Sequence, residues 1–189
     1  MLEGAIVFTG NHNEVEINIR HVQRDDVERL LALINTISKE QSFILFQGEQ
    51  MTLEEESRYV EGFIKKAADH KAVKLLVFHE DILIGLADVT MKDRAESHIG
   101  VFGIFLAKEW RNKGIGNFLM QKTLEEAEKN ITNLKMITLG VFANNPIAKR
   151  MYEKMGFNEY GILPQGLQHR GELVDHIYMY RMVHKVESS

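Results

Sequence analysis

The stretch EWRNKGIGNFL, residues 109–119, places an arginine, a lysine and two glycines directly before an apolar run. A glycine-containing turn that leads into a helix exposes several backbone N–H groups without a partner inside the helix, and these converge with the positive end of the helix dipole. Gly114 and Gly116 let the backbone approach an anion without obstruction by a Cβ atom, and Arg111 and Lys113 add charge at the rim. This chemistry suits a pyrophosphate.

Two better-known phosphate motifs do not fit this stretch. No Lys-Ser or Lys-Thr pair follows a glycine at the Walker spacing, and the third glycine of the dinucleotide fingerprint is replaced by Leu119. An NTPase and a Rossmann-type enzyme are therefore disfavoured. A lone Gly-x-Gly also fits ordinary turn chemistry at the start of a helix, so the rest of the chain must decide.

Composition narrows the classes further. A chain of 189 residues with 44% hydrophobic content predicts one domain over residues 1–189. A formal charge of -4 and no long basic tract argue against nucleic acid as the main partner. The absence of cysteine excludes disulfides, thiolate zinc sites and a cysteine nucleophile, and the eight histidines lack metal-ligand spacing, so no metal is expected. Without a signal peptide or membrane-spanning run, we expect a soluble, cytoplasmic protein with no membrane partner.

Apolar periodicity predicts the elements of the N-terminal part. Residues 15–19 alternate as in a strand, and the AIVF stretch before them pairs back across a turn at residues 10–13. Apolar residues at helical spacing predict a helix over residues 25–37, with two aspartates near its start. A second helix begins at the capping box of Thr52 and Glu55.

The remainder alternates strands and helices. Six strands are predicted, in AVKLLVFHE, DILIGLADVTM, HIGVFGIFLA, KMITLGVFA, FNEYGIL and ELVDHIYMYRM. One helix runs from about Gly114 to Asn130, and another, with apolar residues on one face, ends at Gly156. The glycine turn therefore joins a strand to a helix. The order indicates a mixed α/β (α+β) fold.

Two segments carry a resemblance to a known family. RNKGIG matches the Arg/Gln-x-x-Gly-x-Gly/Ala signature of the GCN5-related N-acetyltransferase (GNAT) superfamily, and VFANNPIAKRMYEKMGF resembles a second block of that family. The segments INIRHVQRDDVERLLAL and ELVDHIYMYRM resemble its first strand and helix and its closing strand, so the resemblance covers almost the whole chain. It implies a central, mostly antiparallel sheet of about seven strands, flanked by about four helices and splayed between the two central strands.

The resemblance also implies acetyl-CoA as co-substrate and assigns residues to it. The strand before the turn would pair its backbone with the pantetheine arm, the turn would cradle the pyrophosphate, and an asparagine would support the arm. The implied cofactor-binding residues are Phe105, Leu106, Ala107, Arg111, Asn112, Lys113, Gly114, Ile115, Gly116, Asn117 and Asn145. Tyr152 matches the usual general acid, which protonates the departing thiolate. Spacing alone favours Tyr152 as a core residue on an apolar helix face, and only the motif around it supports the catalytic role. Asn145 before Pro146 fits a helix N-cap equally well.

The sequence departs from the family at the expected general base. Many family members carry a glutamate on the strand before the cradle, where this chain has Val101 and Phe102. His98 is the nearby candidate, because a histidine titrates near neutral pH. An ordered water chain, or an amine deprotonated in solution, serves the same reaction.

The acceptor is constrained mainly by the family. The resemblance implies direct attack of a neutral amine on the thioester, and an acceptor pocket made by the first two helices, their connecting loop and the last hairpin. The acceptor would be a small-molecule amine or a protein N-terminus, and a homodimer is a further expectation. Glutamates 40, 49 and 54–56 lie where they could attract a cation, or simply favour a helix dipole. Two other readings stay open: a catalytically weak acyl-CoA-binding or sensor protein on the same fold, and a different phosphate-ligand binder such as a nucleotide-binding module.

Overall fold

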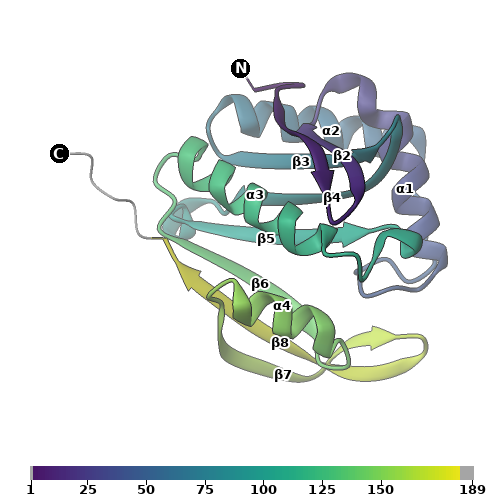
Figure 1. Ribbon diagram of the computed structural model, residues 1–189. Coiled ribbons are helices and arrows are strands. Elements are labelled where there is room, and N and C mark those ends of the chain that lie inside the picture. The colour runs from purple at the N-terminus through teal and green to yellow at the C-terminus, as the bar shows by residue number, and fades with distance from the viewer. Residues whose placement is uncertain (1, 184–189) are drawn as a thin grey trace.

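A computed structural model describes residues 2–183 and shows one eight-stranded sheet in the order β1-β2-β3-β4-β5-β6-β8-β7 (Figure 1). The strands are β1 (Ile6–His12), β2 (Val15–His21), β3 (Ala72–His79), β4 (Ile82–Met91), β5 (Ile99–Leu106), β6 (Met136–Phe142), β7 (Asn158–His169) and β8 (Glu172–Met182). The helices are α1 (Val27–Lys39), α2 (Leu53–Ala68), α3 (Ile115–Asn130) and α4 (Pro146–Lys154), with short 3-10 turns η1 (Arg24–Asp26), η2 (Arg94–Glu96) and η3 (Lys108–Trp110).

The sheet opens between its two central strands. All other neighbours are antiparallel, but β5 and β6 are parallel and pair only from Ile99 with Met136 to Val101 with Thr138. Beyond that point β5 continues to Leu106 and β6 to Phe142, but the two strands no longer pair with each other. The expected splay between the central strands is therefore confirmed.

Helices cover both faces of the sheet, and each face has its own hydrophobic core. Figure 1 shows α3 and α4 on one side of the sheet and α1 and α2 on the other. The first core contains Leu119 and Met120 of α3 with Ile84 and Ile137 of the sheet, and all four side chains are buried. The second core joins α1 and α2 to the opposite face; its members include Leu30, Leu33, Phe63, Leu76 and Leu86. Alternation along β5 follows the same division, because Phe102, Ile104 and Leu106 lie in the first core and Phe105 packs against the second.

Three details differ from the sequence prediction. The sheet has eight strands, where the resemblance implied about seven; the predicted N-terminal hairpin, here β1 and β2, is present. The turn between these two strands is at Asn13 and Glu14, both with positive φ, at the end of the predicted range of residues 10–13 and one residue beyond it. Strand β7 extends past Pro164 to His169, because bulges in its pairing with β8 absorb the interruption. No helix within residues 2–183 is long and apolar enough to cross a membrane.

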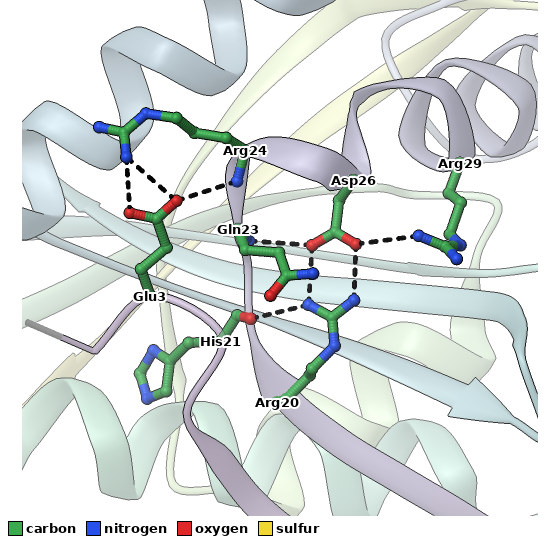
Figure 2. A network of polar contacts seen from close by, with 7 residues as sticks. All are labelled: Glu3, Arg20, His21, Gln23, Arg24, Asp26 and Arg29. Carbon is green, nitrogen blue, oxygen red and sulfur yellow. Dashed lines mark hydrogen bonds and ion pairs between the residues drawn. The ribbon is translucent and has the colours of Figure 1, made fainter.

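A polar network fixes the start of α1 against the sheet (Figure 2). Arg20 on β2 donates two hydrogen bonds to the carboxylate of Asp26, at 2.7 and 2.6 Å, and the backbone N–H of Gln23 donates a third at 2.9 Å. The Asp26 side chain is fully buried. Beside it, Arg24 pairs with Glu3 at 2.9 Å. The start of α2 follows the predicted capping box, in which Thr52 and Glu55 exchange hydrogen bonds.

Candidate active site

The turn before α3 presents a row of backbone amides without partners. Within residues 2–183, the N–H groups of Asn112, Lys113, Gly114, Ile115, Gly116 and Asn117 donate to no acceptor. The first bonded amides on either side are Arg111, which donates to Lys108, and Phe118, which donates to Gly114. Unpaired amides at a helix start, together with the helix dipole, form an anion-binding site.

Glycine is required at position 114 for two reasons. Its φ of 80° lies in the left-handed region, which β-carbon-bearing residues adopt at a cost. An added Cβ would also overlap the side-chain amide of Asn13, which donates a 3.0 Å hydrogen bond to the Lys113 carbonyl. The turn of the N-terminal hairpin therefore holds the amide row from outside, and Figure 1 shows this hairpin beside α3.

The two basic side chains of the turn are already engaged. Arg111 donates through Nε to the Leu106 carbonyl at 2.8 Å and pairs with Glu40 at 2.8 Å. Lys113 places its Nζ over the ring of Trp110, 4.7 Å from the centroid. Arg111 thus links the ends of β5 and α1, and the positive character left at the turn comes chiefly from the amides.

Strand β5 leads into this turn with one edge free. Past Val101 it pairs only with β4, and the Ala107 N–H donates to Ile84 of β4 at 2.8 Å. Because backbone groups of successive strand residues point to alternate edges, Ile104 and Leu106 direct their N–H groups into the splay. An extended ligand entering the splay would meet these groups beside the amide row.

Helix α4 brings the other predicted residues to the same side. Asn145 is the N-cap: its Oδ1 accepts from the Ala148 N–H at 3.2 Å, and its amide nitrogen has no partner within residues 2–183. Met151 lies near the first turn of α3, since an added Cβ at Gly116 would be 3.8 Å from its sulfur. Tyr152, the next residue, belongs to the same hydrophobic core as Ile115 and Leu119 of α3.

Tyr152 is buried except for a small exposed fraction of 8%. Its ring packs edge-on against Phe102, and its hydroxyl has no hydrogen-bond partner in the described part of the chain. Burial raises the pKa of Tyr152 to about 12. The phenol is therefore protonated at neutral pH and free to donate a hydrogen bond.

His98 lies elsewhere. It is exposed and immediately precedes Ile99, the first residue of β5, whereas the amide row follows Leu106, the last residue of that strand. At roughly 3.3 Å per strand residue, about 25 Å of β5 separates the two. His98 therefore lies away from the amide row, next to the end of β5 that pairs with β6.

The opposite face of the sheet contains a cavity that the sequence did not indicate. Its volume is about 170 Å³. It is lined by Leu30, Ile34, Phe46, Met51, Glu56, Tyr59, Lys74, Leu86, Asp88 and Phe105. Three of these carry a carboxyl or an ammonium group and form no ion pair with one another within residues 2–183: Glu56, Lys74 and Asp88. Lys74 and Asp88 interrupt otherwise apolar strand sequences, and this was the signal available in the sequence.

The pKa of each of these three groups is raised from its ordinary value. Lys74 donates to the Tyr59 hydroxyl at 2.9 Å; burial opposes its charge, but the net direction of its pKa is upward because Asp88, Tyr59 and Glu56 lie near. Burial raises the pKa of Asp88 and of Glu56, against the attraction of Lys74. The cavity therefore holds two carboxyl groups and one ammonium, which favours a ligand with a positive group.

Only one of the glutamates considered in the sequence reaches this cavity. Glu40 pairs with Arg111, Glu54 lies 3.9 Å from Arg58, and Glu55 completes the cap of α2. Glu49 accepts from the Gln47 backbone, and Glu56 alone lines the cavity.

The loop between α1 and α2 is attached to the last hairpin. His169 at the end of β7 contacts the Gln41 carbonyl at 3.1 Å and the Asn144 side chain at 2.9 Å. Phe43 packs against His169, with ring centroids 4.5 Å apart. The loop and the hairpin expected to form the acceptor pocket thus lie side by side.

Most residues of this site fall within the range that a protein-family model matches. The model of the Acetyltransferase (GNAT) family matches residues 34–157, which span the amide row, the splay and α4. The chain belongs to the GNAT acetyltransferase family. An L-amino acid N-acetyltransferase, AaaT of Escherichia coli, is 32% identical over 120 residues, covering 62% of this chain and 74% of that protein.

Solved GNAT structures share the fold. An acetyltransferase of the GNAT family from Streptococcus pneumoniae has a TM-score of 0.81 at 27% identity and covers 89% of this chain and 100% of that one. The yncA structure from Salmonella typhimurium, with its cofactor acetyl-CoA, has a TM-score of 0.78 at 14% identity and covers 92% and 97%. The protein is an N-acetyltransferase of the GNAT family.

Proposed function

We propose that this GNAT protein transfers an acetyl group from acetyl-CoA to a primary amine by direct attack. The observation that carries the proposal is the row of six unpartnered amides, residues 112–117, beside the free edge of β5. The amides bind the diphosphate, and the N–H groups of Ile104 and Leu106 bind the pantetheine arm in the splay. The relative with acetyl-CoA in its structure has the same fold and supports this choice.

Residues of both sheet faces then take part in the reaction. Backbone N–H groups of β5 polarise the thioester carbonyl, and the amine attacks from the face of α1 and α2. Tyr152, on the opposite face, donates its proton to the sulfur as the carbon–sulfur bond breaks. Asn145 holds the carrier arm with its free amide nitrogen.

The cavity near Asp88 is the proposed acceptor site. Its mixed lining, with two carboxyl groups, one ammonium and apolar walls from α1, suits a small amine that carries positive charge before it reacts. A free amino acid is one such acceptor, as the name of the E. coli relative states for that protein. A protein N-terminus presents the same amine, and a panel containing both kinds of acceptor separates them.

Ligand-induced stabilisation tests the carrier. A ligand at 100 times its Kd stabilises by about 2.7 kcal/mol, so acetyl-CoA should raise the melting temperature while ATP and NAD should not. The absence of a shift with acetyl-CoA would reject both the enzyme and an acyl-CoA sensor. A shift with ATP or NAD instead would favour the nucleotide-binding alternative.

Turnover separates an enzyme from a binder. Release of free CoA thiol with an amine panel is expected for the wild type, and Tyr152→Phe should lower kcat by about 10- to 100-fold with acetyl-CoA binding unchanged. Equal kcat values for wild type and variant would remove the acid role. No thiol release with any amine, despite a thermal shift, would favour the sensor.

A further inference from the structure

Two glycines face each other across the splay on the side of the sheet that carries α1 and α2. Gly103 of β5 and Gly140 of β6 each lie two residues beyond the last β5–β6 pair, Val101 with Thr138. Both are exposed in the middle of their strands. The sheet surface at the splay is therefore bare backbone, and it would be covered by any larger residue.

Each glycine lies beneath a titratable side chain of the next strand. An added Cβ at Gly103 would be 3.7 Å from Oδ1 of Asp88 on β4, and one at Gly140 would overlap Nε2 of His176 on β8. Both side chains thus extend one strand inward, from opposite sides, toward the splay. His176 reaches this position because glycine occupies position 140.

His176 has the properties of a free base. It is half-buried, and its imidazole has no hydrogen-bond partner within residues 2–183. The cross-strand neighbours Phe142 and Leu163 are apolar, and Tyr178, with ring centroids 4.2 Å apart, is the titratable side chain against it. Burial lowers the pKa of His176, so the ring is neutral at pH 7.

Asp88 is less suited to that role. Its Oδ2 accepts a hydrogen bond from Thr90 at 3.3 Å, and the Lys74 ammonium shares its cavity. Although burial raises the pKa of Asp88, its carboxyl group already interacts with Thr90 and lies near Lys74, whereas the His176 ring has no hydrogen-bond partner within residues 2–183. Asp88 therefore suits the approach of an ammonium, and His176, on the other side of the splay, is the free group that can accept a proton.

We propose that His176 is the general base of the acetyl transfer, with its Nε2 taking a proton from the acceptor amine above the backbone of Gly140. The proposal rests on the proposed function. As the new carbon–nitrogen bond forms, His176 removes one amine proton, the carbon–sulfur bond breaks, and Tyr152 supplies a proton to the thiolate. The imidazolium then releases its proton to water and Tyr152 regains one, so the net products are the amide and free CoA.

The proposed acid, Tyr152, and the proposed base, His176, lie on opposite faces of the sheet. Tyr152 belongs to the core under α3 and α4, whereas His176 lies on the face of α1 and α2 with Gly140. The amine adds to the planar thioester carbonyl and forms a tetrahedral intermediate, from which the thiolate then leaves. A base beside the attacking amine and an acid beside the sulfur can therefore act from different faces of the sheet.

The pH profile of turnover is the primary test. The wild type should lose kcat/KM at low pH, with a limb below the ordinary histidine value of about 6.5, because protonated His176 accepts no proton. His176→Gln keeps the size and polarity and should lower kcat about 100-fold and remove this limb. The limb at higher pH that comes from the acceptor amine itself should remain.

Two further variants distinguish loss of the base from loss of the fold. His176→Ala leaves space over Gly140, and added imidazole should restore part of its turnover. Gly140→Ala should displace the ring and lower kcat at least tenfold. In all three variants the thermal shift with acetyl-CoA should match that of the wild type, which shows that the fold and the carrier site are intact.

The same experiments can overturn the inference. A low-pH limb that persists in His176→Gln with unchanged kcat, or one that disappears in Asp88→Asn or His98→Gln instead, would assign the base elsewhere. A wild type that binds acetyl-CoA but acetylates no amine would defeat the proposed function itself. The two failures are therefore distinguishable.

Discussion

The starts of α1 and α3 differ in whether their polar groups have partners within the chain. At the start of α1, the buried Asp26 carboxylate accepts from Arg20 and from the Gln23 backbone, so its acceptors are occupied (Figure 2). At the start of α3, the six amides of residues 112–117 have no acceptor within the described chain. Both helix starts follow a strand, β2 before α1 and β5 before α3.

The difference separates a stabilising site from a binding site. A buried group with every partner supplied by the chain contributes to folding and presents nothing to a ligand. Amides without a partner from the chain, at a turn with a left-handed glycine, stay available to an anion, and the binding of that anion adds stability. Substitutions at α1 should therefore change unfolding, and substitutions at α3 should change binding.

The largest effect is expected at Asp26. Asp26→Ala removes one partner of a buried pair and leaves Arg20 uncompensated, so the free energy of unfolding should fall by about 3–5 kcal/mol. Urea unfolding measures this. Asp25→Ala, an exposed neighbour, should change it by less than about 0.5 kcal/mol. A small loss at Asp26 would mean that the network is not structural.

Gly114→Val should separate the two sites further. The added side chain is strained at a φ of 80° and crowds Asn13 at the amide row, so the thermal shift with acetyl-CoA should disappear, with an affinity loss of about 100-fold. Gly171→Val is the matched control: its φ is 85° and an added Cβ meets nothing within 4 Å. The control should show similar backbone strain, about 1–2 kcal/mol, and full acetyl-CoA binding. Equal loss of binding in both would refute the cradle.

Substitution of Arg111 should lower stability less than that of Asp26 and weaken binding less than that of Gly114. Because its guanidinium is bound to the Leu106 carbonyl and to Glu40, Arg111→Gln should lower the free energy of unfolding by about 1–2 kcal/mol. The Kd for acetyl-CoA, measured by calorimetry, should rise less than about threefold. A rise near that of Gly114→Val would show that the side chain turns toward the diphosphate.

The smallest effect concerns pH and stability. Burial lowers the pKa of His21 despite its 2.9 Å contact with Glu126, so the unfolded chain takes up this proton more readily than the folded one. The contribution of His21 is complete above pH 6.5 and is lost as pH falls from there toward the folded-state pKa. Unfolding curves at pH 7.5 and 5.5 should therefore differ less for His21→Gln than for the wild type. A larger difference in the variant would reverse the assignment.

Much of the fold followed from local patterns. The capping box of Thr52 and Glu55, the hairpin of β3 and β4, and the glycine turn between β5 and α3 depend on residues close in sequence, and the structure contains them. The length of β7 was missed, because bulges past Pro164 depend on pairing with β8. The position of the β1–β2 turn depends likewise on pairing between strands.

The chain alone determined the chemistry of the turn at residues 111–117, since a strand, two glycines and a helix start are encoded within a few residues of one another. Only the tertiary structure decided which groups were free. It showed Arg111 paired with Glu40, 71 residues away, placed His98 at the end of β5 that is remote from the amide row, and brought His176 over Gly140. Such contacts depend on strand order and register, which residue spacing along the chain does not specify.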